Sequence, residues 1–216
     1  MNKVIKIYEI LKDTQPTYEE TEHDWMRNGL SSTPFKHLVS CALSTVTTTA
    51  RTVKACNALY AEVKNFDDIR KLSDERLIEL IKPVAHYNRK ARTLKKMCDI
   101  IVDDYDNRIP DTKEELLRLP GIGQKCANLM LNYKYEKPVI AVDTHIHRVI
   151  NRLGIVRAST HEKSAEQLND ITPEEYKKHA HEWLIAVGMN ICKPRKPHCS
   201  ECPVSAYCDY YRQRAA

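Results

Sequence analysis

LPGIGQKCA, residues Leu119–Ala127, joins two stretches with helical periodicity, Lys113–Arg118 and about Gln124–Tyr133. Its two glycines flank the apolar Ile122 and favour a tight turn, because glycine accepts backbone angles that other residues avoid. Backbone N–H groups beside these glycines can approach a phosphate, and the positive end of the following helix attracts an anion. Ile122 is expected to point inward and to fix the turn. The alternative is a plain corner between two helices, since many turns use glycine.

The rest of the chain also has the pattern of helices. Hydrophobic residues make up 42% and charged residues 29% of the sequence, as in ordinary globular proteins. Strand-type alternation is scarce, so we expect an all-α protein. The expected helix starts are Thr33-Pro34, Ser73 before Asp74–Ile81, Pro110-Asp111 with a reciprocal cap from Glu114, and the capping-box pattern Thr172-Pro173-Glu174-Glu175 of a helix through Val187. A further helix is expected from about Arg89 to Asp104.

Length and charge limit the class of protein. The chain of 216 residues suits one large or two small domains, and its net charge of +5 permits an acidic partner without demanding one. The N-terminus lacks the apolar core of a signal peptide, and no stretch is long enough to span a membrane. We therefore expect a reducing compartment, in which disulfides are rare.

A second motif is the run Val139–Val149, VIAVDTHIHRV. An apolar stretch ends at Asp143, and a helix is expected to begin with Thr144. Asp143 is placed as its N-cap and Gly154 as the residue that ends it. Taken alone, this motif predicts only a capped helix.

Four cysteines near the C-terminus follow the pattern Cys192-x6-Cys199-x2-Cys202-x5-Cys208. Such a set can hold an iron–sulfur cluster, ligate zinc or form disulfides. A structural zinc site usually has two tight pairs, and only one tight pair is present, so the spacing favours the cluster. The four remaining cysteines have apolar neighbours and are expected to be buried core residues: Cys41, Cys56, Cys98 and Cys126.

Together the three motifs resemble endonuclease III, a family of helix-hairpin-helix DNA glycosylases of base excision repair. The resemblance runs from about Thr33 to the C-terminal tail. Besides the motifs, it includes Pro34-Phe35, Leu43-Ser44, Tyr87-Asn88-x-Lys90-Ala91 and His181-x-Trp183-Leu184.

The resemblance implies two domains with the active site in the cleft between them. Residues 27–137 would form a six-helix domain with the hairpin, and residues 1–26 with 138–216 would form a domain that carries a [4Fe–4S] cluster. The family's cluster ligands fall on Cys192, Cys199, Cys202 and Cys208. The cluster is expected to be structural and to hold a loop whose basic residues contact DNA phosphates.

The resemblance also implies a mechanism. The family flips a damaged pyrimidine out of the duplex and cuts its glycosidic bond. Lys125 matches the family's nucleophile, and Asp143 matches its catalytic carboxylate. A lysine amine can form a Schiff base with the sugar, which permits β-elimination and makes the enzyme bifunctional, a glycosylase and an AP lyase. Without the motif, Lys125 would be a solvated surface lysine.

The implied partner is double-stranded DNA with damaged bases or AP sites, bound by a monomer in the cytoplasm near the nucleoid. The residues expected to bind DNA are Gly121, Ile122, Gly123, Val46, His86, His145, Lys193, Arg195 and Lys196.

Two positions depart from the family pattern. The usual Leu-Ser-Ala-Gln-Ala-Thr-Asp is replaced by Leu43–Thr49, LSTVTTT, so Val46 stands where a glutamine enters the gap left by the flipped base. Valine fills volume but forms no side-chain hydrogen bond. The usual Gly-Leu-Tyr-Asn is Ala85–Asn88, so His86 replaces an apolar wedge. Its ring can stack on bases, worth about 1–3 kcal/mol each. We expect altered lesion or opposite-base preferences, with neutral drift as the alternative.

The leading functional hypothesis is thus a repair enzyme that removes oxidised pyrimidines and nicks the strand. A second hypothesis keeps the scaffold but shifts the target to mismatched or deaminated bases, or to AP sites alone. A third is a non-catalytic DNA-binding or redox-sensing protein, which the presence of Lys125 and Asp143 argues against.

Overall fold

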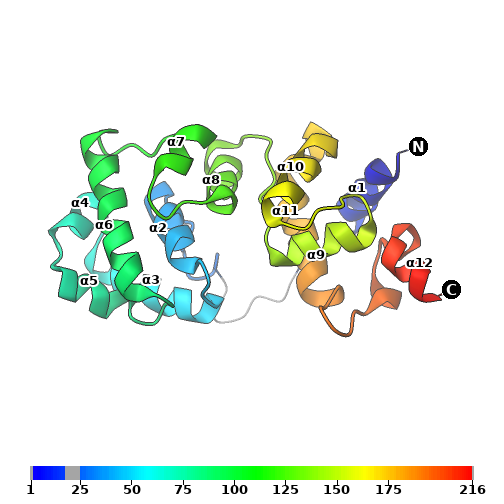
Figure 1. Ribbon diagram of the computed structural model, residues 1–216, viewed down its shortest axis with the longest axis horizontal. Helices are drawn as coiled ribbons and strands as arrows, with labels where there is room; N and C mark the ends of the chain where they lie inside the picture. The colour runs from blue at the N-terminus through cyan, green and yellow to red at the C-terminus, as the bar shows by residue number, and fades with distance from the viewer. Residues whose placement is uncertain (1, 18–24, 216) are drawn as a thin grey trace. The chain divides into compact units, whose positions relative to one another are not determined.

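The computed structural model describes residues 2–17 and 25–215, and every regular element within these ranges is helical (Figure 1). The expectation of an all-α protein is confirmed. None of the helices in these ranges has both the length and the apolar character needed to cross a membrane. The α-helices are α1 (Lys3–Thr14), α2 (Pro34–Ser44), α3 (Thr49–Glu62), α4 (Phe66–Lys71), α5 (Asp74–Ile81), α6 (Tyr87–Asp103), α7 (Lys113–Arg118), α8 (Gln124–Tyr135), α9 (Thr144–Leu153), α10 (His161–Ile171), α11 (Glu174–Ala186) and α12 (Asp209–Ala215). The shorter elements are the π-helical η1 (Val187–Ile191) and the 3-10 turns η2 (Cys199–Glu201) and η3 (Ser205–Tyr207).

The chain forms two compact units. The first, Glu20–Tyr135, contains α2 to α8 and is called the hairpin unit below. In it α6 packs against α4 and α5, and α8 packs against α2 and α7. Fully buried apolar side chains from these helices form its core, among them Leu38, Leu43, Leu59, Ile69, Leu77, Ile81, Leu94 and Met97.

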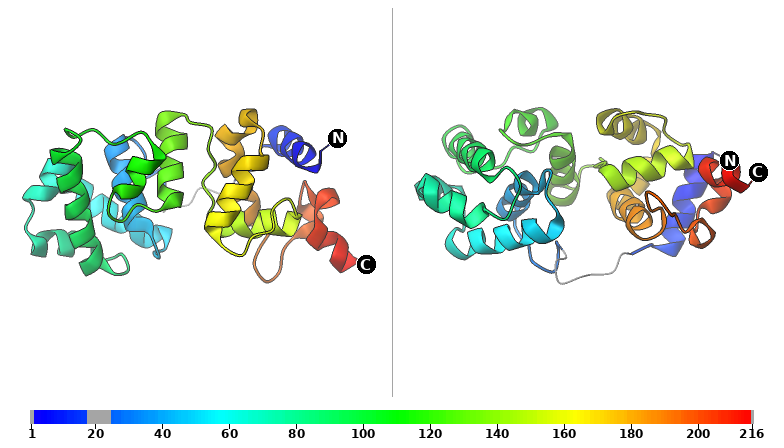
Figure 2. Two further views of the ribbon diagram at one scale, coloured as in Figure 1. Left: turned by 45° about the horizontal axis from the view of Figure 1, so that its top comes forward. Right: turned by 60° about the horizontal axis from the view of Figure 1, so that its bottom comes forward.

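The second unit, the terminal unit, combines Met1–Glu19 with Glu136–Ala216, and both chain ends belong to it (Figure 2). Helix α1 contributes Ile7, Tyr8 and Leu11 to one apolar core with α9, α10 and α11. Lys3 at the start of α1 forms an ion pair of 2.7 Å with Asp209 at the start of α12. This ion pair joins the first and the last helix of the terminal unit.

Several helices begin where their capping residues predict. The Thr33 hydroxyl accepts the N–H of Lys36, with Pro34 as the first helical residue, and the Ser73 hydroxyl accepts the N–H of Arg76. Each cap satisfies one of the N–H groups that a helix start leaves without a partner. Helix α9 ends at Gly154 with φ of 73°, the left-handed conformation predicted for this glycine.

Two predicted caps are wrong. Helix α7 starts one residue later than Pro110-Asp111 suggested, and Thr112 pairs with Glu115, rather than Glu114, in the capping box. The Thr172 hydroxyl does not cap α11, because it lies 3.0 Å from the buried hydroxyl of Tyr8 in α1. In both cases a helix does begin near the predicted position, but contacts with neighbouring residues decide which side chain caps it.

The close approach at Gly154 leads to a prediction about stability. A Cβ at this position would lie 1.8 Å from Oδ2 of Asp209, and the backbone is left-handed. We expect Gly154→Ala to lower the free energy of unfolding by about 1–3 kcal/mol, measured by chemical denaturation. The double variant Gly154→Ala with Asp209→Ala should recover part of this loss relative to Asp209→Ala alone. Unchanged stability in Gly154→Ala would contradict this description of the helix end.

Candidate active site

The hairpin turn between α7 and α8 has two glycines with different surroundings. Gly121 has φ of 84°, and a Cβ there would lie 2.9 Å from the side chain of Thr93 in α6. Gly123 is exposed, and a Cβ there would meet nothing within 4 Å. Ile122 is buried and its N–H donates to the carbonyl of Leu119, which confirms that it points inward. The turn needs glycine at 121 for its own geometry, whereas the space at 123 is open to a ligand.

Lys125 is exposed in the first turn of α8, directly after this hairpin. The next residue, Cys126, is buried, and its pKa is lowered by a hydrogen bond with Cys41 and by the nearby charge of Lys125. The helix thus presents its lysine outward above a buried thiol pair. As predicted, the thiols of Cys41, Cys56, Cys98 and Cys126 are all buried and free.

Asp143 is the N-cap of α9, as predicted from its position. Its Oδ1 accepts the N–H groups of His145 and Ile146, each at 2.9 Å. These two bonds fix the orientation of a half-buried carboxylate at the positive end of a helix. His145 is half-buried beside it, against Gly188 of η1.

Two arginines of α9 hold the start of the cysteine loop. Arg148 donates to the carbonyls of Cys192 and Gly188, both at 2.7 Å. Arg152 donates to Sγ of Cys192 at 3.3 Å and to the carbonyls of Lys193 and Pro194. The helix that begins at Asp143 therefore also positions the first cysteine of the loop, a role that sequence reasoning missed.

The four cysteines of the loop lie near one another. Burial, together with the nearby thiols of Cys208, Cys192 and Cys199, raises the pKa of the Cys202 thiol to about 11. In the described part of the chain, no three histidine, cysteine or acidic side chains are close enough to hold one metal ion. All four thiols are free and half-buried, and Cys192, Cys202 and Cys208 pack against the apolar core of the terminal unit. They supply the four thiolate ligands that a [4Fe–4S] cluster requires.

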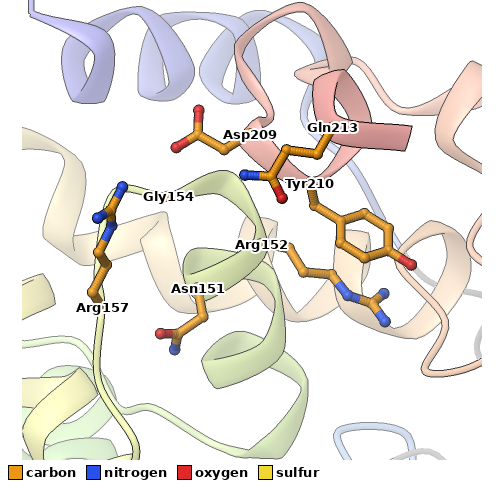
Figure 3. A pocket seen from close by; sticks show the side chains of 7 residues that line it. All are labelled: Asn151, Arg152, Gly154, Arg157, Asp209, Tyr210 and Gln213. Carbon is orange, nitrogen blue, oxygen red and sulfur yellow. The ribbon is translucent and has the colours of Figure 1, made fainter. Parts of the chain in front are cut away.

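Three basic residues predicted to contact DNA lie on this loop between its first two cysteines, and all three are exposed: Lys193, Arg195 and Lys196. Beside the loop lies a cavity of about 440 Å³, lined by Asn151, Arg152, Gly154, Arg157, Asp209, Tyr210 and Gln213 (Figure 3). In it the guanidinium of Arg152 lies 4.5 Å from the ring centre of Tyr210. None of the predicted site residues lines this cavity, so we assign it no part in catalysis.

Val46 and His86 are both exposed and both have left-handed backbones, with φ of 52° and 56°. Such a backbone is a strained conformation for a β-branched residue like valine. Val46 is 80% exposed, the largest exposure among the described large hydrophobic residues. An apolar side chain held outward on a strained turn is suited to enter another molecule.

A buried lysine connects the two loops that carry these residues. Nζ of Lys90 donates to the carbonyls of Leu43 and Thr45, at 2.7 and 2.6 Å, and to the Thr47 hydroxyl at 3.0 Å. The same hydroxyl accepts the N–H of Ala85 at 3.1 Å. Burial, together with the charges of Arg89 and Arg51, lowers the pKa of Lys90 to about 8. Sequence reasoning noted Lys90 only as part of the resemblance.

The helical fold, the hairpin and the cysteine loop define a DNA repair protein. Residues 39–174 match the family model described as HhH-GPD superfamily base excision DNA repair protein. Residues 192–208 match the iron–sulfur binding domain of endonuclease III. Within the superfamily, the chain belongs to the endonuclease III family, and it carries a [4Fe–4S] cluster.

Similar proteins support this classification. Endonuclease III of Thermotoga maritima is 39% identical over 188 residues, which cover 87% of this chain and 88% of the relative. The solved structure of a trapped covalent intermediate of endonuclease III with DNA has a TM-score of 0.84 at 30% identity and covers 100% of both chains. A thermostable thymine-DNA glycosylase has a TM-score of 0.80 at 25% identity, covering 97% of this chain and 95% of that one.

The two glycines of the hairpin provide a matched pair of variants. Gly121→Ala should lower the free energy of unfolding by about 1–3 kcal/mol, because the backbone is left-handed and Thr93 is close. Gly123→Ala should leave stability unchanged within about 0.5 kcal/mol, because nothing lies near the added methyl group. It should weaken binding to duplex DNA about 10-fold, because the methyl group would keep a phosphate from one charged hydrogen bond with the backbone. Denaturation and fluorescence anisotropy measure the two effects. Equal effects of both variants on stability would refute this division of roles.

The contacts of Lys90 predict a second stability effect. Lys90→Met keeps the length of the side chain but leaves the buried carbonyl of Leu43 and the part-buried carbonyl of Thr45 without their donor, so we expect a loss of about 2–3 kcal/mol. Lys178→Met, which removes an exposed ion pair with Glu136, should cost less than about 1 kcal/mol.

The pH dependence of the stability lost in Lys90→Met gives an independent check. Between pH of about 8 and 10.5 the unfolded chain retains a proton on Lys90 that the folded protein has released. Stability therefore rises with pH in this window. The stability of the wild type relative to Lys90→Met should increase from pH 8 to pH 10, and a constant difference would contradict the lowered pKa.

Proposed function

We propose that this protein excises oxidised pyrimidines from double-stranded DNA and then nicks the strand at the resulting AP site. The observation that carries the proposal is an exposed lysine, Lys125, in the first helical turn after a hairpin whose Gly123 is open to a ligand. The endonuclease III family membership and the likeness to a trapped covalent DNA intermediate support a bifunctional glycosylase and lyase that acts on damaged bases.

In the first step, DNA binds to the hairpin and to the loop basic residues Lys193, Arg195 and Lys196, and the damaged nucleotide leaves the base stack. The N–H groups at Gly121 and Gly123, with the positive end of α8, bind a phosphate of the damaged strand. The family's cluster supplies a structural anchor for the cysteine loop through Cys192, Cys199, Cys202 and Cys208.

In the second step, the neutral amine of Lys125 attacks C1′ of the flipped nucleotide, and the bond between C1′ and the base breaks. Asp143 accepts a proton from Lys125 and stabilises positive charge on the sugar. The bond between C1′ and O4′ then opens, O4′ takes up a proton, and a Schiff base forms between C1′ and Nζ. This Schiff base loses a proton at C2′, and the 3′ phosphate leaves by β-elimination.

Incision of a duplex that contains thymine glycol, without alkali, tests this proposal. The wild type should release the base and nick the strand, whereas Lys125→Ala should do neither above background. Lys54→Ala, which removes an exposed lysine of α3, serves as the matched control and should retain activity. Nicking by Lys125→Ala at the wild-type rate would overturn the assignment of the nucleophile.

A second candidate function is the removal of mismatched or deaminated bases by the same chemistry. It is favoured by Val46 and His86, which replace the family's glutamine and apolar wedge, and by the likeness to a thymine-DNA glycosylase. From the family resemblance we propose that the protein acts as a monomer, and because its substrate is DNA, that it acts in the cytoplasm at the nucleoid.

Substitution at the two exposed loop residues should change which opposite base is preferred. Val46→Gln restores a hydrogen-bonding side chain, and His86→Leu restores an apolar wedge. We expect the double variant to shift relative incision rates for one lesion placed opposite A, G, C and T by about 5-fold, the value of one hydrogen bond of about 1 kcal/mol. An unchanged profile would mean that neither residue sets specificity.

A further inference from the structure

Helix α6 has a row of three exposed cations: Arg89, Arg92 and Lys96. Their spacing of three and four residues places them on one face of the helix. In the described residues, none of the three has a hydrogen-bond or ion-pair partner. The row therefore combines like charges that no carboxylate neutralises.

Three other charged residues of the same helix form ion pairs. Lys95 pairs with Asp74 at 2.9 Å, and Asp99 and Asp103 both pair with Arg70, at 3.2 and 2.9 Å. Ion pairs thus satisfy the side of α6 that faces α4 and α5. The uncompensated cations of the row create a local positive potential, which attracts an anionic partner.

The row lies between the hairpin and the loop that carries His86. His86 immediately precedes α6, and the charge of Arg89 is close enough to lower the pKa of Lys90 beneath that loop. Halfway along the row, Thr93 lies against Gly121 of the hairpin turn. Helix α6 therefore connects two elements that are proposed to contact DNA (Figure 1).

We propose that Arg89, Arg92 and Lys96 bind consecutive phosphates of the DNA backbone, as an extension of the hairpin site. The inference rests on the proposed function only in taking duplex DNA as the ligand. From residue 89 to residue 96 the helix rises by about 10 Å, enough to follow about three phosphates of one strand. Arginine presents a planar donor fork that matches a phosphate, and lysine adds a point charge.

The salt dependence of binding tests this proposal. The triple variant Arg89→Gln, Arg92→Gln, Lys96→Gln should reduce the slope of log K against log salt by about 2.7, or about 0.9 for each lost contact. Between 50 and 200 mM salt, its affinity should therefore fall about 40-fold less than that of the wild type. The probes are an undamaged duplex and one with a tetrahydrofuran abasic analogue, and both slopes should change equally because phosphate contacts are independent of sequence.

The control variant Lys64→Gln with Lys71→Gln removes two exposed cations, one before α4 and one at its last residue, and should keep the wild-type slope. A wild-type slope in the triple variant, with circular dichroism unchanged, would overturn the proposal. If the triple variant lowers the slope as expected but the wild type does not nick thymine glycol, the proposed function is wrong while the proposed phosphate contacts of α6 are supported.

Discussion

The hydrogen bonds that Oδ1 of Asp143 accepts from the N–H groups of His145 and Ile146 are the constraint on which the terminal unit depends. They start α9 at one residue and fix the carboxylate that the proposed reaction needs. Arg148 and Arg152, further along the helix, hold the backbone at Cys192. One short helix thus couples the orientation of the proposed catalytic carboxylate to the position of the cysteine loop.

In the hairpin unit, backbone conformation rather than a carboxylate fixes the start of a helix that carries a proposed site residue. Gly121 lets the turn approach α6, and this contact orders the start of α8, where Lys125 is exposed. Lys90 binds the loop that carries Val46, and through the Thr47 hydroxyl that loop is joined to the one that carries His86. The left-handed backbone of Val46 is strained for a β-branched residue, and it lies at a position proposed to contact DNA.

The features that could be predicted from sequence are those with a local physical cause. Thr33, Ser73 and Asp143 cap the helices that follow them, and the inward direction of Ile122 follows from its place between two glycines. The features that were missed join residues far apart in the chain. The Thr172 hydroxyl forms a hydrogen bond with the hydroxyl of Tyr8, 164 residues away, and Lys90 donates to carbonyls more than 40 residues away. No local pattern specifies such partners, because tertiary packing selects them.

The identity of the residue that bonds to DNA tests the central claim most directly. Borohydride added during reaction with a thymine-glycol duplex should reduce the Schiff base to a stable amine and trap a covalent complex. Protease digestion and mass spectrometry should then locate the added mass on the peptide that contains Lys125. An adduct on another lysine such as Lys90, or on the N-terminal amine, would contradict the account, as would strand nicking with no trapped complex.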